Sequence, residues 1–379
     1  MFTSPTASRQ NAATATAESE PQLPSTGIVV AAARLSVLFG PLRTVELPVE
    51  QMPDAHRTHG YDLAVTLDCG QSFCWRPVDA QRTGWIGWAG AVPCIVSQHT
   101  AGQPLRVTAP VSAIGQSDIT PAALVDYFQT QTPYAPLFAT FPDSRRDTNL
   151  AKAMAYCGGM RILKQPAWET TASFICSAQK QIVQIMQINS SLRRSYAAAA
   201  ADAAAAVSSA SSSAQAQIED ALHFQHLHAF PEATLLATAG EAELRLCKLG
   251  FRAKHLHRTA LQIAAADPAL PDLAEISGLT LMDAVERFTR FHGVGEKVAS
   301  CILLFAYQRM DAFPVDVWVQ RILSDLYIPK KADQNPVYIR QFAASYFGPN
   351  AGVAQQVLFH WYRNGAPGQD ASVTQTKTS

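Results

Sequence analysis

A Gly-x-Gly turn that leads into an apolar helix constrains the fold of this chain more than any other sequence feature. Residues 292–301 read His-Gly-Val-Gly-Glu-Lys-Val-Ala-Ser-Cys and predict this turn, with Lys297 in the first turn of the helix. Both Gly293 and Gly295 can adopt positive φ angles and bring the backbone close to a ligand. The unpaired amides at such a helix start suit a phosphate group.

Lys297 has the surroundings that an amine nucleophile needs. The positive end of the helix dipole disfavours its protonated form, and desolvation by the apolar residues that follow acts in the same direction. Only the neutral amine attacks carbon. Cys301 lies four residues further on, so we expect it on the same helix face.

A candidate carboxylate, Asp316, follows about one helix length later. Pro314 favours an extended or turn conformation for the residue before it, and residues 317–323 predict a new helix with Asp316 as its N-cap. A lysine in a first helical turn is usually a solvated surface residue, and an aspartate before a helix is usually only a cap. Their order and spacing together nevertheless predict an active site.

Composition sets wider bounds on the chain. Its 379 residues suffice for two or three domains, and a hydrophobic fraction of 48% provides a sizeable core. The formal net charge is zero, so a surface that binds a polyanion would have to come from local clusters of cations. The alternative is that the two clusters below are only the solvated faces of two helices. One acid-free cluster comprises Arg245, Lys248, Arg252, Lys254 and Arg258. A second cluster, in which Glu169 is the one acidic residue, comprises Arg161, Lys164, Lys180, Arg193 and Arg194.

The cysteine pattern gives no sign of a metal site. The seven cysteines form no C-x-x-C pair and no zinc pattern, so we expect neither metal nor cofactor. The N-terminus lacks an apolar signal region, and no apolar run reaches membrane-spanning length. We expect no membrane partner and an intracellular location, in the cytoplasm or nucleoid of a microbe or in the nucleus of a eukaryote.

Pattern changes along the chain predict an α+β organisation. Short alternating runs such as residues 61–67 predict an N-terminal antiparallel β-sheet domain over residues 26–150, and helical periodicity predicts a second domain over residues 151–364. We expect disorder in residues 1–25 and 365–379. Residues 197–216 are almost entirely Ala and Ser and predict an insertion loop or a frayed helix extension.

These motifs together resemble the helix-hairpin-helix (HhH-GPD) superfamily of base-excision DNA glycosylases, and most closely the microbial 8-oxoguanine DNA glycosylases. The resemblance covers roughly residues 61–363 and implies a TBP-like sheet domain followed by a helical glycosylase domain. It implies a monomer that acts on double-stranded DNA with an oxidised purine. By this resemblance Lys297 attacks C1′ of a flipped nucleotide, Asp316 stabilises the developing positive charge, and a Schiff base leads to β-elimination.

The resemblance also implies a pocket for the base. The glycine that leads residues 70–76 matches one whose carbonyl reads the extra N7 hydrogen of 8-oxoguanine. Residues 354–359 match a recognition helix that reads the base edge with an amide and stacks a ring on the base, with Cys301 as the opposite wall. The implied substrate-binding residues are Gly70, Cys301, Pro314, Gln355 and Phe359.

The remaining matches concern the duplex. Residues 173–182 resemble a helix end whose side chain fills the space that the base leaves, and residues 248–254 resemble a wedge loop in which an aromatic ring intercalates. By the resemblance, Arg252 reaches toward the opposite base. The implied DNA-binding residues are Gln179, Gln181, Phe251, Arg252, His292, Gly293, Gly295 and Val298.

Two departures and three rivals keep alternatives open. Gln184 replaces an arginine that touches the opposite cytosine in animal and fungal members, so the opposite-base preference stays open. Trp318 replaces a histidine that contacts phosphate in the animal enzymes, so that contact is lost or made by another group. The rivals are a glycosylase for formamidopyrimidines or alkylated purines, an endonuclease III-like enzyme, and a non-catalytic helix-hairpin-helix DNA-binding protein. An alkyl-base enzyme would lack Lys297, and an endonuclease III-like enzyme would carry cysteines after Cys301.

Overall fold

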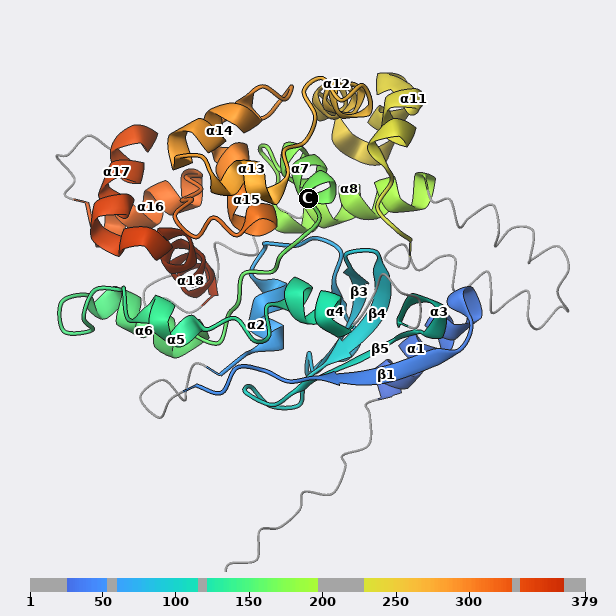
Figure 1. The fold of residues 1–379 in the computed structure, drawn as a ribbon, viewed down its shortest axis with the longest axis horizontal. Coiled ribbons are helices and arrows are strands. Elements are labelled where there is room, and N and C mark those ends of the chain that lie inside the picture. Colours follow the sequence, from blue (N-terminus) through green and yellow to red (C-terminus); the bar gives the residue numbers. More distant parts are fainter. Residues whose placement is uncertain (1–25, 53–59, 115–120, 197–227, 329–334, 365–379) are drawn as a thin grey trace, which may run out of the picture.

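The computed structural model describes residues 26–52, 60–114, 121–196, 228–328 and 335–364. Within them, an antiparallel sheet with a few helices forms one part of the molecule, and helices alone form the other (Figure 1). This confirms the predicted α+β architecture. The segments expected to be disordered, 1–25 and 365–379, and the Ala/Ser-rich stretch 197–216 lie outside the described residues.

The sheet has five strands in the order β1-β5-β4-β3-β2, and each neighbouring pair is antiparallel. Helix α1 packs Ala31 and Leu35 against Ile86 and Ile95 on one face of the sheet. Trp85, one position before Ile86, faces the other way into a second core that α2 and α4 help to cover. The strands are β1 (Leu42–Leu47), β2 (Arg76–Pro77), β3 (Gly84–Ala89), β4 (Val92–Ser97) and β5 (Leu105–Pro110).

The interpretation of residues 61–67 as a strand was wrong. Asp62 accepts a hydrogen bond from Val65 N at 3.0 Å and caps a short helix, α2 (Leu63–Asp68). The buried positions are Leu63, Thr66 and Leu67, which is helical spacing, whereas the apolar alternation in the sequence also fits a strand. Residues 26–39, placed in the expected sheet region, likewise form a helix, α1 (Thr26–Phe39). For residues 61–67, seven positions were too few to separate a helical from a strand periodicity.

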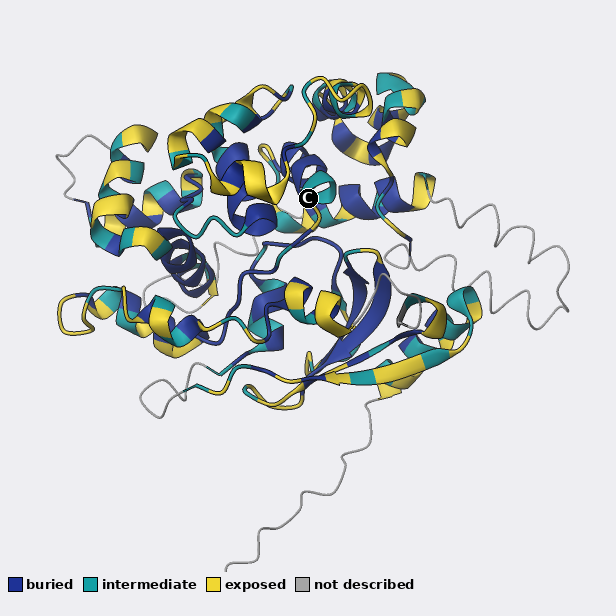
Figure 2. Cartoon of the chain, viewed as in Figure 1, coloured by how far each residue is buried: buried dark blue, intermediate teal, exposed yellow. Residues whose placement is uncertain are grey.

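Helix α15 forms the centre of the helical part. Every residue from Val298 to Tyr307 is buried, and α7 and α14 pack along it (Figure 2). Helix α18 is almost as deeply buried and packs on α6 and α16. Besides α1 and α2, the helices of the described residues are α3 (Val111–Ile114), α4 (Pro121–Phe128), α5 (Tyr134–Phe138), α6 (Thr148–Cys157), α7 (Ala167–Cys176), α8 (Ile182–Ser195), α11 (Ala233–Leu244), a π-helical turn (Arg245–Leu249), α12 (Arg252–Ala264), α13 (Leu273–Ser277), α14 (Leu281–Thr289), α15 (Glu296–Tyr307), α16 (Val317–Leu326), α17 (Pro336–Phe347), a 3-10 turn (Gly348–Asn350) and α18 (Ala351–Asn364). None of the helices in the described ranges has the length and apolar character needed to span a membrane.

Two cations expected in a surface cluster are buried structural groups instead. Arg161 lies 3.5 Å from Glu50 and over the ring of Tyr134, and Arg193 pairs with Glu169. Both guanidinium groups are inaccessible to a nucleic acid. The second cationic cluster is therefore not a continuous surface patch, because linear charge counts carry no information on partners distant in the sequence.

Candidate active site

A cavity of about 450 Å³ opens between the sheet part and the helical part. The end of α7, the start of α8, one face of α15, the N-terminus of α16 and one face of α18 line it, together with the loop after α2. It brings together eight of the predicted site residues, which the sequence scatters over almost 300 positions. These are Gly70, Gln181, Lys297, Cys301, Pro314, Asp316, Gln355 and Phe359.

Lys297 points into this cavity from the first turn of α15. Its Nζ donates a hydrogen bond to Ser177 Oγ at 3.3 Å and lies 5.3 Å from the centre of the Phe174 ring. Phe174 in turn stacks on Phe305 of α15, with the ring planes 17° apart. The amine is thus held by a hydroxyl and a ring at the end of α7, unlike the solvated lysine usual in a first helical turn.

Asp316 is the N-cap of α16, as predicted. Its Oδ1 accepts hydrogen bonds from Trp318 N at 3.0 Å and from Val319 N at 2.9 Å. The carboxylate lines the same cavity as Lys297. The cap fixes one carboxylate oxygen to the backbone.

The thiol of Cys301 faces both charged groups. Burial raises its pKa to about 11, the nearby Asp316 carboxylate adds to the increase, and Lys297 opposes it. The thiol is therefore protonated at neutral pH, and the sulfur serves as a packing surface in the cavity wall. A protonated thiol does not compete with the amine as a nucleophile.

Gly70 has a backbone conformation that requires glycine. Its φ is +83°, and a Cβ atom there would lie 2.7 Å from Cδ1 of Ile182 across the cavity. The positive angle favours glycine, and a side chain there would also require Ile182 to shift. Gly70 therefore lines the cavity without a side chain of its own.

Gln71 fixes the position of this glycine. Its side-chain Nε2 donates to the carbonyls of Thr66 and Arg161, each at 2.8 Å, and its Oε1 accepts from Leu163 N at 2.9 Å. Its own carbonyl accepts from Gln165 Nε2 at 2.8 Å. A fully buried side chain with every polar group paired makes a rigid support for the Gly70 loop.

Helix α18 contributes one face to the cavity. Gln355, Phe359 and Arg363 follow one another at intervals of four residues and all line it. The Arg363 guanidinium lies 5.5 Å from the centre of the Phe359 ring and donates to Asp68 O at 3.1 Å. Gln356, also a lining residue, donates to Gln355 Oε1 at 2.9 Å.

Sequence reasoning missed Gln356, Arg363, Ser177 and Ile182. The spacing of Arg363 from Phe359 continues the four-residue interval, so this position could have been found by extending the helix face. The other three carry no local signal.

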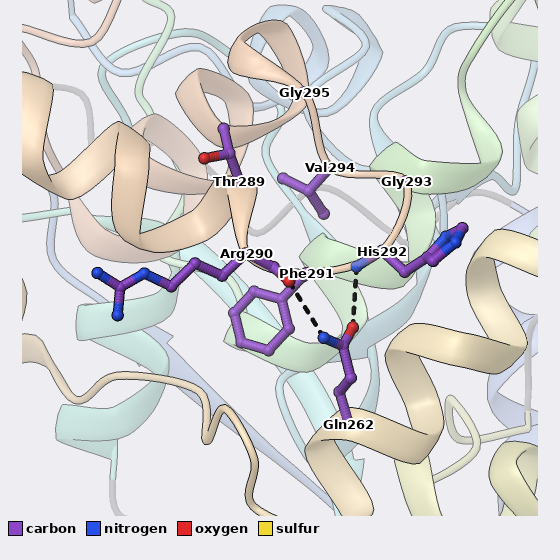
Figure 3. A pocket seen from close by; sticks show the side chains of 8 residues that line it. All are labelled: Gln262, Thr289, Arg290, Phe291, His292, Gly293, Val294 and Gly295. Atoms are coloured by element: carbon purple, nitrogen blue, oxygen red, sulfur yellow. Dashed lines mark hydrogen bonds between the residues drawn. The ribbon is translucent and has the colours of Figure 1, made fainter.

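The hairpin before α15 forms a second, open recess of about 440 Å³ (Figure 3). Gly293 has a φ of +86°, and a Cβ there would come within 2.5 Å of His255 Cβ. Gly295 has a φ of −93° and is the N-cap of α15, so only Gly293 uses the positive angle that glycine allows. Gln262 fastens the loop by accepting from His292 N at 2.9 Å and donating to Arg290 O at 3.1 Å (Figure 3).

Both ring nitrogens of His292 are engaged within the protein. Nδ1 lies 3.0 Å from His255 Nδ1, and Nε2 lies 2.9 Å from Arg258 Nη1. Because a guanidinium can only donate, Nε2 accepts and Nδ1 carries the proton of a neutral ring. Burial lowers the pKa of His292, and Arg258 and His255 lower it further. The amides of His292 and Val294 already donate to Gln262 Oε1 and Phe291 O. The amides of Gly293, Gly295 and the first turn of α15, which includes the buried Val298, remain as groups that can face a phosphate.

The predicted wedge loop and helix end lie side by side because Arg252 joins them. Arg252 Nε donates to Ala178 O at 2.6 Å, and its Nη1 donates to Leu249 O at 3.1 Å. Its guanidinium also lies 4.3 Å from the centre of the Phe251 ring. The buried Arg252 thus couples the exposed Phe251 to the loop that carries Gln179.

Two glutamines follow at the start of α8. Gln179 is exposed with a φ of +55°, immediately beyond the end of α7. Gln181 is the N-cap of α8 and forms a reciprocal capping box with Gln184. Gln184 therefore has a local structural function at the start of α8.

Known families match the two parts of the chain. Residues 55–171 match the model of the 8-oxoguanine DNA glycosylase N-terminal domain, and residues 172–347 match that of HhH-GPD superfamily base excision DNA repair proteins. Gly70 falls in the first match, and Lys297 and Asp316 fall in the second. The chain therefore belongs to the HhH-GPD superfamily and, within it, to the 8-oxoguanine DNA glycosylases, as its sequence motifs predicted.

Individual relatives span both parts. The N-glycosylase/DNA lyase OGG1 of Arabidopsis thaliana is 26% identical over 78% of this chain and 76% of its own length. A probable N-glycosylase/DNA lyase of Methanothermobacter thermautotrophicus is 27% identical over 80% of this chain and 94% of its own length. The structure of the Clostridium acetobutylicum 8-oxoguanine glycosylase/lyase with dsDNA containing cytosine opposite 8-oxoG matches with a TM-score of 0.62, at 26% identity over 80% of this chain and 92% of that one.

The described residues contain no group of three or more His, Cys, Asp and Glu side chains that could hold a metal ion.

Proposed function

We propose that this protein excises 8-oxoguanine from duplex DNA and then nicks the strand, with Lys297 as nucleophile and Asp316 as the stabilising carboxylate. The observation that carries this assignment is the orientation of a first-turn lysine into a base-sized cavity that also contains a capping aspartate. The protein is a DNA N-glycosylase with AP lyase activity.

The chemistry follows from these groups. A neutral Lys297 amine attacks C1′ of the flipped nucleotide, the bond from C1′ to the base breaks, and the base leaves with the bonding electron pair and takes up a proton. Asp316 stabilises the positive charge that develops on the sugar. Loss of a proton from the amine and opening of the sugar ring give an imine. Removal of a C2′ proton then expels the 3′ phosphate by β-elimination.

Base recognition is assigned to the walls of the cavity. A flipped purine fits between the ring of Phe359 and the sulfur of Cys301, with Pro314 beside it. The amide of Gln355 meets its Watson–Crick edge, and the carbonyl of Gly70 accepts the N7 hydrogen that distinguishes 8-oxoguanine from guanine. The positive φ of Gly70 and the hydrogen bonds of Gln71 support this carbonyl contact.

DNA binding is assigned to the outer loops. Phe251 is 49% exposed and available to wedge into the stack, and Gln179 is available to fill the vacated space. The amides of Gly293, Gly295 and the first turn of α15, up to Val298, are assigned to the phosphate backbone. One chain supplies all of these groups, so we propose that the protein acts as a monomer.

Borohydride trapping tests the assignment. Duplexes with one 8-oxoguanine opposite each of the four bases should give a covalent adduct with the wild-type protein and none with Lys297→Gln. Lys180→Gln, a change at the second lysine in the cavity wall, and Lys152→Gln, at an exposed lysine on α6, should both retain the adduct. An adduct that survives in Lys297→Gln would refute the assignment of the nucleophile. Binding without any adduct opposite all four bases would refute the lyase chemistry.

A further inference from the structure

An unpaired amide oxygen lies buried in the wall of the base cavity. Gln356 is only 6% exposed and lines this cavity, and its Nε2 donates to Gln355 Oε1 at 2.9 Å. Its own Oε1 has no hydrogen-bond partner among the described residues. Buried polar atoms without a partner are uncommon in folded proteins, because desolvation without a new hydrogen bond is unfavourable. This oxygen is therefore an acceptor whose hydrogen-bonding capacity is unused in the wall of the cavity.

The two adjacent glutamines present a defined set of polar groups. Gln355 Oε1 already accepts one hydrogen bond and has a second lone pair, Gln356 Oε1 is unpaired, and Gln355 Nε2 is a donor. Together they offer two acceptors and one donor. The Watson–Crick edge of guanine is the complement, with one acceptor at O6 and donors at N1 and the N2 amine. Adenine offers one acceptor and one donor and leaves one of the oxygens unpaired.

We propose that Gln356 Oε1 accepts a hydrogen bond from the exocyclic N2 amine of the flipped base, so that Gln356 determines specificity for guanine-type lesions. This inference rests on the proposed excision of 8-oxoguanine and identifies a contact within the same cavity. The amide nitrogen of Gln356 also holds the Gln355 amide in one orientation, which keeps the Gln355 amide aligned with the N1 and O6 positions of the base.

A purely structural role for Gln356 makes a different prediction. If Gln356 only oriented Gln355, its loss would slow the excision of every base that Gln355 contacts by a similar factor. A direct contact to N2 instead affects only bases that carry this amine. The separating probe is 8-oxohypoxanthine, which is 8-oxoguanine without the N2 amine.

The experiment measures single-turnover excision of 8-oxoguanine and 8-oxohypoxanthine, each opposite cytosine. We compare the wild-type protein with Gln356→Met, which keeps the side-chain length and removes the amide, and with Gln341→Met as a matched change at an exposed glutamine on α17. The wild-type protein and Gln341→Met should prefer 8-oxoguanine by about tenfold or more, the factor expected when a buried acceptor loses its donor. In Gln356→Met this preference should fall below about twofold, mainly because 8-oxoguanine excision slows.

The outcomes separate this inference from the proposed function. No excision of 8-oxoguanine by the wild-type protein would refute the proposed function and this inference with it. Excision without a preference over 8-oxohypoxanthine would refute only the inference, and this result needs no variant. An equal slowing of both bases in a folded Gln356→Met would also refute it. Gln356→Leu provides a second apolar replacement if the Met variant fails to fold.

Discussion

The dual role of Asp316 can be separated by substitution. Its Oδ1 caps α16 by accepting from Trp318 N and Val319 N, and its charge is assigned to the transition state. Asparagine preserves the cap and removes the charge, whereas alanine removes both. The pair of variants Asp316→Asn and Asp316→Ala therefore distinguishes a catalytic carboxylate from an ordinary helix cap.

The magnitudes follow from the two functions. Loss of the cap in Asp316→Ala should cost about 1 kcal/mol of unfolding free energy, and loss of the favourable charge at the helix start about 0.5 kcal/mol more. Asp316→Asn should lose only the smaller amount, because asparagine caps as well as aspartate. Both variants should excise 8-oxoguanine more slowly by about 100-fold or more, the effect typical of removing one electrostatic contact to a transition state.

Urea unfolding and single-turnover excision, measured on the same protein preparations, provide the assay. The expected pattern is a large loss of rate in Asp316→Asn with a small loss of stability. An Asp316→Asn protein that excises 8-oxoguanine within about threefold of the wild-type rate would refute the catalytic role and leave Asp316 as a cap, since asparagine matches aspartate only as a cap.

Three further substitutions test the cavity, the buried interior and the wedge. Gly70→Ala should lose about 1–2 kcal/mol of unfolding free energy because its φ is +83°; adding Ile182→Val, which removes the Cδ1 atom 2.7 Å from the new Cβ, should recover only the steric part, and full recovery would contradict the strain. Burial, and then Arg363, lower the pKa of His360 to about 4, so His360 is neutral in the fold and gains a proton on unfolding below its ordinary value of 6.5. Stability should therefore fall between pH 6.5 and pH 4 by on the order of 3 kcal/mol more than in His360→Gln, and equal pH slopes in urea unfolding would disprove this. Phe251→Ala should change stability by less than about 0.5 kcal/mol, since the ring is 49% exposed, yet weaken lesion-duplex binding about tenfold in fluorescence anisotropy, whereas Phe251→Tyr should bind like the wild type.

The parts of the site that were predictable from sequence are those governed by local backbone physics. Glycine at positions 293 and 295 predicts a turn, the apolar run after it predicts α15, and the aspartate after Pro314 predicts an N-cap; the structure has all three. The same reasoning failed for residues 61–67, where apolar alternation over one short segment fits a strand and a helix alike. The cap at Asp62 was the available signal for the helix.

The parts that were not predictable depend on partners far along the chain. Arg161 and Arg193 are cations in the sequence and buried ion-pair members in the fold, because Glu50 and Glu169 happen to lie beside them. Arg252 was expected to face DNA and instead bonds a carbonyl 74 positions earlier in the chain. Gln356 has no distinguishing neighbours in the sequence, and only the three-dimensional cavity reveals its unpaired oxygen. Composition and periodicity contain no information on such pairings.

The division of the cavity between the two parts of the molecule has a testable consequence. Lys297 and Asp316 lie entirely on the helical part, whereas Gly70 reaches the cavity from the loop after α2, where Gln71 holds it. Replacing Gln71 with leucine of similar size removes side-chain hydrogen bonds at 2.8 to 2.9 Å and leaves the carbonyl of Arg161 and the amide of Leu163 without them. Each unpaired buried group costs about 1–3 kcal/mol, so the Gly70 loop should loosen while the lysine and the aspartate stay in place.

Gln71→Leu should therefore lose much of its 8-oxoguanine excision but retain strand nicking at a preformed abasic site, where no base has to be recognised. Nicking depends on Lys297 and the open cavity, and Ser177 and Phe174 of α7 hold the amine. Parallel assays on the two substrates, with Lys297→Gln as the variant inactive on both, measure the ratio directly. Equal losses on the two substrates in a folded Gln71→Leu protein would mean that the Gly70 loop supports the whole cavity. Recognition and chemistry would then not be separable in this fold.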